Sequence, residues 1–145
     1  MKALLQRVSS GSVSVADKSI AAIDKGLVIL VGIGHSDDAA QVQAMAEKIA
    51  TLRIFEDEAG KMNLSILDSG GSALVVSQFT LYADTSKGRR PAFTDAAAPE
   101  VASRLVDGFI KAMIGLGVPT CAGVFGAHMQ VSLINDGPVT ILLEL

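Results

Sequence analysis

The chain has 145 residues, and half of them are hydrophobic, which suits one domain with a core of apolar side chains. The net charge of −3 excludes a strongly basic nucleic-acid binder, so any RNA contact must come from a local patch or from shape. The single cysteine, Cys121, excludes a disulfide framework and a thiolate metal cluster within one chain.

Nothing in the sequence points to export or to a membrane. The apolar run at the start of the chain is short and is interrupted by Gln6 and Arg7, unlike a signal peptide. No stretch approaches the roughly 20 apolar residues that a membrane-spanning helix needs. Because a single cysteine also suits a reducing compartment, we expect a soluble, cytoplasmic protein with no membrane partner.

Residues 2–34 have the patterns of β-strands. Valine and serine alternate over residues 12–15, which is the period of two of a half-buried strand. Residues 16–19 are predicted to form a turn, after which residues 20–24 form a strand that runs back alongside the first. The continuous apolar run at 27–33, rich in Val and Ile, is typical of a strand that is buried on both faces.

Residues 37–53 change to helical spacing, with Ser36 or Asp37 available as the N-cap. Residues 53–56 then resemble a short strand, and the turn that follows ends at Gly60, which can take a positive φ. The apolar residues that share one face of the helix are Val42, Met45, Ala46, Ile49 and Leu52.

A glycine-rich break at residues 69–72 precedes a buried type of strand at 73–76, which ends at Ser77–Thr80. Residues 99–114 form a second amphipathic helix, and the glycines just beyond it end it. The apolar face of this helix consists of Val101, Leu105, Phe109 and Met113.

Three further strand-like runs follow at 120–125, 129–134 and 139–143. Many strands with two helices between them, joined by short connections, favour a mixed, largely antiparallel sheet curled into a partial β-barrel. We therefore predict a single α/β domain over residues 1–145, with two main helices packed on one side of the sheet. A βαβ nucleotide-binding fold is disfavoured because no Gly-rich loop joins a strand directly to a helix.

Two common kinds of catalytic centre lack the residues that they need. His35 and His128 are far apart in the sequence and have no metal-binding spacing, so no metal site is expected. A Ser-His-Asp triad would have to use His128, and a lone histidine in a loop is more often a solvated residue. Cys121 sits in an apolar run and is more often a small core residue than a nucleophile.

The segment Ser77–Thr80 follows a buried strand, where a chain can present backbone N–H groups and hydroxyls to a ligand. Backbone N–H groups aimed at an oxyanion are a usual means of stabilising acyl transfer. The alternative is a strand that simply continues through Leu81 and Tyr82. The residues alone favour that alternative.

Lys87, Arg89 and Arg90 place three cations within four residues of an otherwise acidic chain. Arginine pairs well with phosphate, so this loop could clamp an RNA backbone. A solvated loop kept extended by Pro91 fits the same residues equally well.

Gly137-Pro138 lies between two strand-like runs. It could form a bulge or a turn, or it could be an ordinary edge-strand proline. If its peptide bond is cis, as in about 5–6% of X-Pro bonds, the two preceding carbonyl groups could point the same way. The residues alone favour the ordinary proline.

Taken together and in this order, these segments resemble the D-aminoacyl-tRNA deacylase family along the whole chain. Each segment is weakly informative alone, whereas the order and spacing of the set are highly specific. The matching segments are Leu5–Val8, Leu52–Asp57, Gly60–Asn63, Val76–Asp84, Lys87–Pro91, Phe125–Leu133 and Asn135–Thr140.

The resemblance implies an ester hydrolase that releases a D-amino acid, and also glycine, from the 3′-terminal adenosine of tRNA. It implies a homodimer with two sites at the interface and no cofactor. Gly137-Pro138, with a cis peptide bond, would reach from one subunit into the site of the other, where its carbonyl oxygens exclude an L side chain. Arg7 would hold this segment in orientation.

Within one subunit the resemblance assigns Ser77, Gln78, Phe79 and Thr80 to the ester. Backbone N–H groups around Phe79 and Thr80 would stabilise the oxyanion. The substrate's own 2′-OH would help to activate water, which suits a chain without an obvious general base. Thr80 as a covalent nucleophile would lack a neighbouring His or Lys base.

The resemblance also assigns residues to the RNA. Phe125 and Met129 match positions that flank the adenine, with core packing as the alternative for both. Lys87, Arg89 and Arg90, whose segment also matches the family, are the expected contacts to tRNA phosphates.

The chain departs from the family in two places. Ser10-Gly11 stands where the family often has Arg-Ala, which removes a cation and thins the RNA-facing patch. His128 stands where the family varies, so we assign it no role. Two other functions stay open: a non-catalytic RNA-binding or DNA-associated partner protein, and a hydrolase of another small ester with Thr80 as nucleophile.

Overall fold

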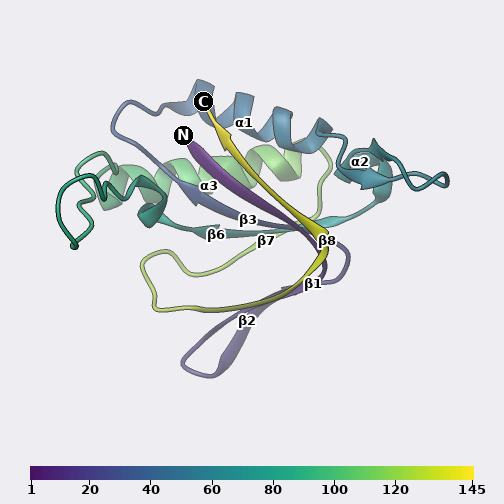
Figure 1. Ribbon diagram of the computed structural model, residues 1–145, viewed down its shortest axis with the longest axis horizontal. Coiled ribbons are helices and arrows are strands. Elements are labelled where there is room, and N and C mark those ends of the chain that lie inside the picture. Colours follow the sequence, from purple (N-terminus) through teal and green to yellow (C-terminus); the bar gives the residue numbers. More distant parts are fainter.

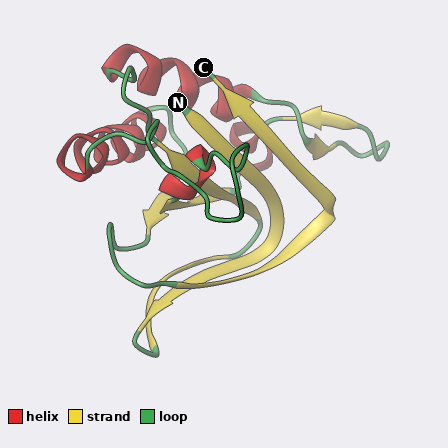
Figure 2. Cartoon of the chain, turned by 60° about the vertical axis from the view of Figure 1, so that its left-hand side comes forward, coloured by secondary structure: helices red, strands yellow, loops and turns green.

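Strand β1 (Lys2–Val15) is the centre of the computed structural model, which describes residues 1–145. It forms antiparallel pairs with three strands, β2 (Lys18–Ile23), β3 (Gly26–Gly32) and β8 (Gln130–Glu144). Three partners are possible because β3 pairs with the first half of β1 and β2 with the second, while β8 follows the other edge. The long strands bend sharply, as Figure 2 shows.

The other half of the sheet is parallel. β3 pairs with β6 (Ser72–Ser77), and β6 pairs with β7 (Thr120–Ala122), both in parallel register. Antiparallel and parallel pairs therefore share one six-stranded sheet that is nearly closed into a barrel. The predicted α/β class and the mixed, partial barrel are confirmed.

Helices α1 (Ala39–Thr51) and α3 (Pro99–Gly115) pack together on one face of this sheet (Figure 1). Each helix lies in a connection between two parallel strands, α1 between β3 and β6 and α3 between β6 and β7. Such a connection has to cross over the sheet and usually contains a helix. The larger core fills the space between sheet and helices, and its largest side chains include Phe55 and Phe109. No helix is both long and apolar enough to cross a membrane.

Four short elements complete the fold. β4 (Phe55–Glu56) and β5 (Met62–Leu64) form a hairpin, followed by helix α2 (Ile66–Ser69) and, after β6, by the 3-10 helix η1 (Phe79–Tyr82). In the turn between β4 and β5, Gly60 has a φ of 72°, as predicted. Helix α2 was not predicted, because a single turn is too short to show a helical period.

The predicted N-cap of α1 is wrong. The cap is Asp38, not Ser36 or Asp37, because the Asp38 carboxylate accepts hydrogen bonds from the N–H groups of Ala40 and Gln41. These bonds satisfy two of the N–H groups that the first turn of a helix leaves without partners. The carboxylate of Asp37 is therefore free for contacts outside the helix.

The last two predicted strand-like runs are one strand, β8, interrupted by a bulge. The register against β1 shifts there, and residues 136–139 of β8 lie opposite the single residue Arg7. The run predicted at 120–125 is also shorter than expected, since β7 ends at Ala122. Gly137-Pro138 therefore lies on the bulge of β8, and the predicted adenine segment with Phe125 and Met129 lies in the loop after β7.

Candidate active site

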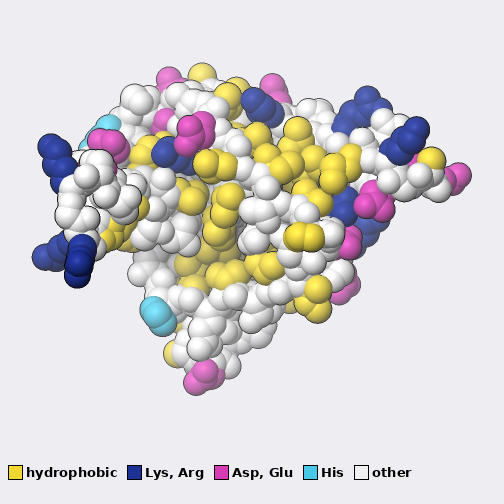
Figure 3. All heavy atoms as spheres, viewed as in Figure 1, with side chains coloured by type: hydrophobic (Ala, Val, Ile, Leu, Met, Phe, Trp, Pro, Cys, Tyr) yellow, Lys and Arg dark blue, Asp and Glu magenta, His cyan; other side chains and the backbone are white.

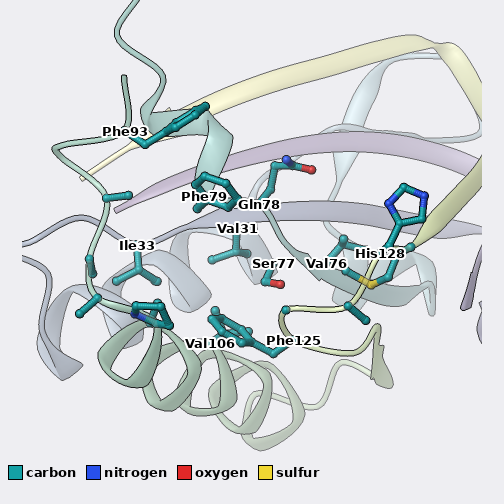
Figure 4. Close-up of a pocket in the computed structure, with 18 of the residues that line it drawn as sticks. Val31, Ile33, Val76, Ser77, Gln78, Phe79, Phe93, Val106, Phe125 and His128 are labelled. Atoms are coloured by element: carbon teal, nitrogen blue, oxygen red, sulfur yellow. The ribbon is translucent and has the colours of Figure 1, made fainter. Parts of the chain in front are cut away.

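A cavity of about 730 Å³ opens between the ends of β3 and β6, the start of α3 and the segment that leads into β8 (Figure 4). Val31 of β3 and Val76 of β6 line its floor, and Val106 contributes from α3. Most of the other lining residues are hydrophobic as well. A concave, largely apolar space with a few polar groups is the usual form of a small-ligand site.

The predicted ester motif begins where β6 ends. The Gln78 N–H donates to the carbonyl of Val31 at 2.7 Å, and the chain then turns into η1. The alternative of a strand that continues through Leu81 and Tyr82 is therefore wrong. Of the motif, Ser77, Gln78 and Phe79 line the cavity, whereas Thr80 is exposed outside it.

Phe79 forms one side of the cavity together with Phe93. Phe79 is 57% exposed, and its ring packs edge-to-face against that of Phe93, with centroids 4.9 Å apart and planes at 70°. The two rings lie next to each other in Figure 4. Sequence reasoning missed Phe93 because no periodic pattern surrounds it; its one signal was rarity, since the chain has only five Phe residues.

Phe125 and Met129 line the same cavity from the segment between β7 and β8. In Figure 4, Phe125 lies away from the ring of Phe79. Phe125 is 38% exposed, and Met129 packs partly against the smaller core cluster. Both histidines are lining residues too: His128 is exposed, and the His35 ring bonds to the carbonyl oxygen of Thr94. The fold therefore brings the predicted ester and adenine segments to one space.

Gly137 and Pro138 lie elsewhere, on the bulge of β8, and neither lines this cavity. Both are exposed, and the peptide bond between them is cis. Gly137 has a φ of 139°, which L side chains rarely adopt, and a Cβ there would lie 2.7 Å from the Val139 side chain. The bulge thus requires glycine at this position.

Arg7 lies opposite the bulge and is buried, with 3% of its surface exposed. Its Nε donates to the Asp136 carbonyl at 2.9 Å, and its Nη1 donates to the Ile54 carbonyl at 2.7 Å. Its Nη2 donates to the Glu56 carboxylate at 3.3 Å. The guanidinium therefore ties the bulge to the segment around β4, and the structure brings Arg7 and the Gly-Pro motif together.

Asn135 closes the bulge from within β8. Its amide oxygen accepts a hydrogen bond from the Val139 N–H at 2.7 Å. Its amide nitrogen donates to the Val139 carbonyl at 3.2 Å and to the Thr140 hydroxyl at 3.0 Å. Sequence reasoning placed Asn135 in the motif without a role, because the partners face it only once the register of the bulge is known.

The basic residues Lys87, Arg89 and Arg90 are exposed at the tip of a loop, and none forms an ion pair within the chain. Two backbone hydrogen bonds of 2.8 and 2.9 Å, exchanged by Asp84 and Ala92, close the base of this loop. Lys and Arg side chains gather at the end of the molecule where the loop lies (Figure 3). The three charges are available to an anionic ligand.

The side chains considered as nucleophiles are poorly placed for that role. Cys121 is half-buried, and burial raises the pKa of its thiol, which disfavours the reactive thiolate. The Thr80 hydroxyl accepts a hydrogen bond from the side-chain amide of Gln78, which is not a base. No cluster of three or more His, Cys, Asp or Glu side chains has a metal-binding arrangement.

Comparison with protein families gives one match over nearly the whole chain. The model of the family described as D-Tyr-tRNA(Tyr) deacylase matches residues 4–144. A D-aminoacyl-tRNA deacylase from Chloroflexus aurantiacus is 60% identical over 144 residues, which cover 99% of this chain and 90% of that protein. One from Thermomicrobium roseum is also 60% identical, covering 99% of this chain and 94% of that protein.

Solved structures with the same fold include the following two. One, described as a c-Myc DNA unwinding element binding protein, has 41% identity and a TM-score of 0.94, covering 100% of this chain and 99% of that one. The other is described as a probable eukaryotic D-amino acid tRNA deacylase. It has 18% identity and a TM-score of 0.88, covering 99% of this chain and 98% of that one, and it bears on the fold alone.

Proposed function

Because the chain belongs to the D-Tyr-tRNA(Tyr) deacylase family, we propose that it hydrolyses the ester bond between a D-amino acid and the 3′-terminal adenosine of tRNA. The products are the free D-amino acid and tRNA. Glycyl-tRNA is included among the proposed substrates because glycine also lacks an L side chain. Since these substrates form where tRNA is charged, we place the reaction in the cytoplasm.

One observation carries the proposal: a single cavity joins the ester motif to the segment that resembles the family's adenine site. Ser77, Gln78 and Phe79 line it together with Phe125 and Met129. A volume of about 730 Å³ is ample for a nucleoside with a small acyl group. The adenine would contact the apolar side chains of the second segment, and the ester would lie against the first.

The proposed catalysis relies on backbone groups. Phe79 and Thr80 are the first residues of η1, and the first N–H groups of a helix have no partners within it. Such N–H groups can stabilise the negative charge that develops on the ester carbonyl oxygen. With no side-chain base beside Thr80, water would be activated with the help of the 2′-OH of the terminal adenosine.

The proposed rejection of L-aminoacyl groups depends on a second copy of the chain. Gly137 and Pro138 are exposed and outside the cavity of their own subunit, so they are available to enter that of a partner. Arg7 and Asn135 fix the bulge on which they stand. Carbonyl groups held in this way would clash with an L side chain and spare a D one, whatever its size.

The surface of β8 supports a homodimer. β8 pairs with β1 on one edge only, and its exposed side chains include Ile134 (63% exposed) and Leu142 (51%). Figure 3 shows hydrophobic side chains over the face where β1 and β8 run together. Unpaired strand edges and apolar patches of this kind usually mark contacts between chains.

A second candidate, nucleic-acid binding without catalysis, is favoured by one finding. The relative with 41% identity is described as binding a DNA element, and the exposed loop with Lys87, Arg89 and Arg90 could serve DNA or RNA. Nucleic-acid binding alone does not explain the apolar cavity, because a duplex would be bound mainly through its phosphates. A third candidate, another small ester with Thr80 as nucleophile, is weakened by the position of Thr80 outside the cavity.

The direct test measures release of labelled amino acid from D-Tyr-tRNA and L-Tyr-tRNA under single-turnover conditions. We expect rapid release from the D ester and release at the spontaneous rate from the L ester. Equal turnover of both esters would contradict the proposed exclusion, and turnover of neither would favour the binding candidate. Excess duplex DNA should leave the D-ester rate unchanged; strong inhibition would place DNA at the same site.

A further inference from the structure

The 3-10 helix η1 of the candidate site rests directly on the end of β3. Two glycines allow this approach. A Cβ on Gly32 would lie 3.0 Å from the Gln78 carbonyl oxygen, and a Cβ on Gly34 would lie 2.7 Å from the Tyr82 hydroxyl. A side chain at either position would push η1 away, so its place relative to β3 is closely set by packing.

The carboxylate of Asp37 connects η1 to the rest of this corner. One oxygen accepts a hydrogen bond from the Gly34 N–H at 2.6 Å and another from the Tyr82 hydroxyl at 3.3 Å. The other oxygen is 2.6 Å from the α-ammonium group of Met1. With 2% of its side chain exposed, Asp37 is a buried carboxylate whose partners offset its desolvation and join separate segments.

Tyr82, the last residue of η1, is held on a second side. The Lys2 ammonium lies 4.9 Å from the centre of its ring. Burial raises the pKa of the Tyr82 phenol to about 12, and the carboxylates of Asp37, Glu144 and Asp95 contribute to this value in that order. The phenol therefore stays protonated at neutral pH and can donate to Asp37.

We propose that Asp37 and Tyr82 are positioning residues, which hold η1 so that the N–H groups of Phe79 and Thr80 meet the ester. This inference rests on the proposed function. Neither side chain would touch the reacting atoms. Their hydrogen bond would act through η1, since movement of its last residue also moves its first, only three residues away.

The test compares steady-state kcat and KM on D-Tyr-tRNA for the wild type, Tyr82→Phe and Asp37→Asn. Tyr82→Phe removes only the hydroxyl, so it should fold even if Asp37→Asn does not. A small misplacement of catalytic groups lowers kcat more than binding, and we expect kcat to fall about 10- to 100-fold. KM should stay within about threefold, because Tyr82 is not among the residues that line the cavity.

Asp68→Asn is the matched control. Asp68 also accepts hydrogen bonds from a backbone N–H and a hydroxyl, both of Ser65, but it lies on α2 and does not line the cavity. It should lower stability and leave kcat unchanged. A folded Tyr82→Phe variant with wild-type kcat would overturn the proposal. Absence of turnover in the wild type would instead refute the proposed function.

Tyr82 also allows a test without substrate, because the chain has one Tyr and no Trp. Ultraviolet absorbance at high pH therefore reports this phenol alone, with circular dichroism to confirm that the fold persists. Asp37→Asn should lower the pKa of Tyr82 towards its ordinary value of 10, while Asp68→Asn should not change it. An unchanged value in folded Asp37→Asn would contradict the contact itself.

Discussion

The Ser77–Thr80 motif lies at the mouth of a concave, largely apolar cavity, whereas Gly137-Pro138 stands exposed on an edge strand outside it. The first motif is held by pairing of β6 with β3 and by the packing of η1. The second is held by side chains, those of Arg7 and Asn135. One region is shaped to receive a ligand, and the other is exposed on a supported bulge. In the proposed homodimer the two motifs would complete each other between two chains.

The largest effect is expected when the proposed homodimer is dissociated, which would remove the partner's Gly-Pro bulge from each cavity. Changing Ile134 and Leu142 to Asp places charges on the exposed face of β8 and should produce a monomer with an intact cavity. The L ester should then be hydrolysed nearly as fast as the D ester, a loss of selectivity of about 100-fold or more, because the partner's Gly137-Pro138 is the proposed element that excludes L side chains. Light scattering and single-turnover kinetics on the same samples measure both quantities. A verified monomer that still rejects the L ester would show that the exclusion does not depend on a partner subunit.

A smaller effect is expected when the support of the Gly-Pro bulge is weakened. Arg7→Lys keeps the charge but loses the planar fork that reaches both Asp136 and Ile54. The ratio of D to L turnover should fall about tenfold, and the free energy of unfolding by about 2 kcal/mol. Arg53→Lys is the control, since Arg53 also bonds a backbone carbonyl but serves the β4–β5 hairpin. Equal changes in both variants would argue against a role in chirality.

The smallest effect is expected from a side-chain change in the Ser77–Thr80 motif. Thr80→Ala removes a hydroxyl that is exposed and bonded to Gln78, while the backbone N–H remains. The rate should stay within about tenfold of wild type if backbone groups carry the reaction. A loss of about 10⁴-fold or more in kcat would support Thr80 as a covalent nucleophile instead.

Periodicity in the sequence was enough to find the main elements. The apolar face of α1 holds four of the five predicted residues in buried positions, and the run at 27–33 is a strand buried among β1, β6 and the helices. Short elements escaped this reasoning: α2 has four residues, and the chain after Gln78 turns into η1 instead of continuing as a strand. Periodic patterns need several turns or alternations before they separate one structure from another.

The residues of the candidate site were harder to predict from the sequence than the fold. The order and spacing of short segments indicated the family, whose model matches residues 4–144, and the candidate residues of both motifs were predicted from that resemblance. Phe93, Asn135 and Asp37 were not assigned, because each contacts a partner that is distant in sequence or that faces it only in the irregular register of the bulge. A hydrogen bond between Asp37 and Tyr82, 45 residues apart, leaves no local pattern.

The sequence by itself determined the α/β class, the main strands and helices and the family, since these depend on local periodicity and on residue identity in order. Only the tertiary structure decided that Ser77 and Phe125 line one cavity while Gly137 stands outside it. The reason is physical: the cavity exists only where the parallel pairing of β3 and β6 ends and α3 begins, and the bulge exists only where β8 loses register with β1. Both depend on contacts between segments far apart in the chain.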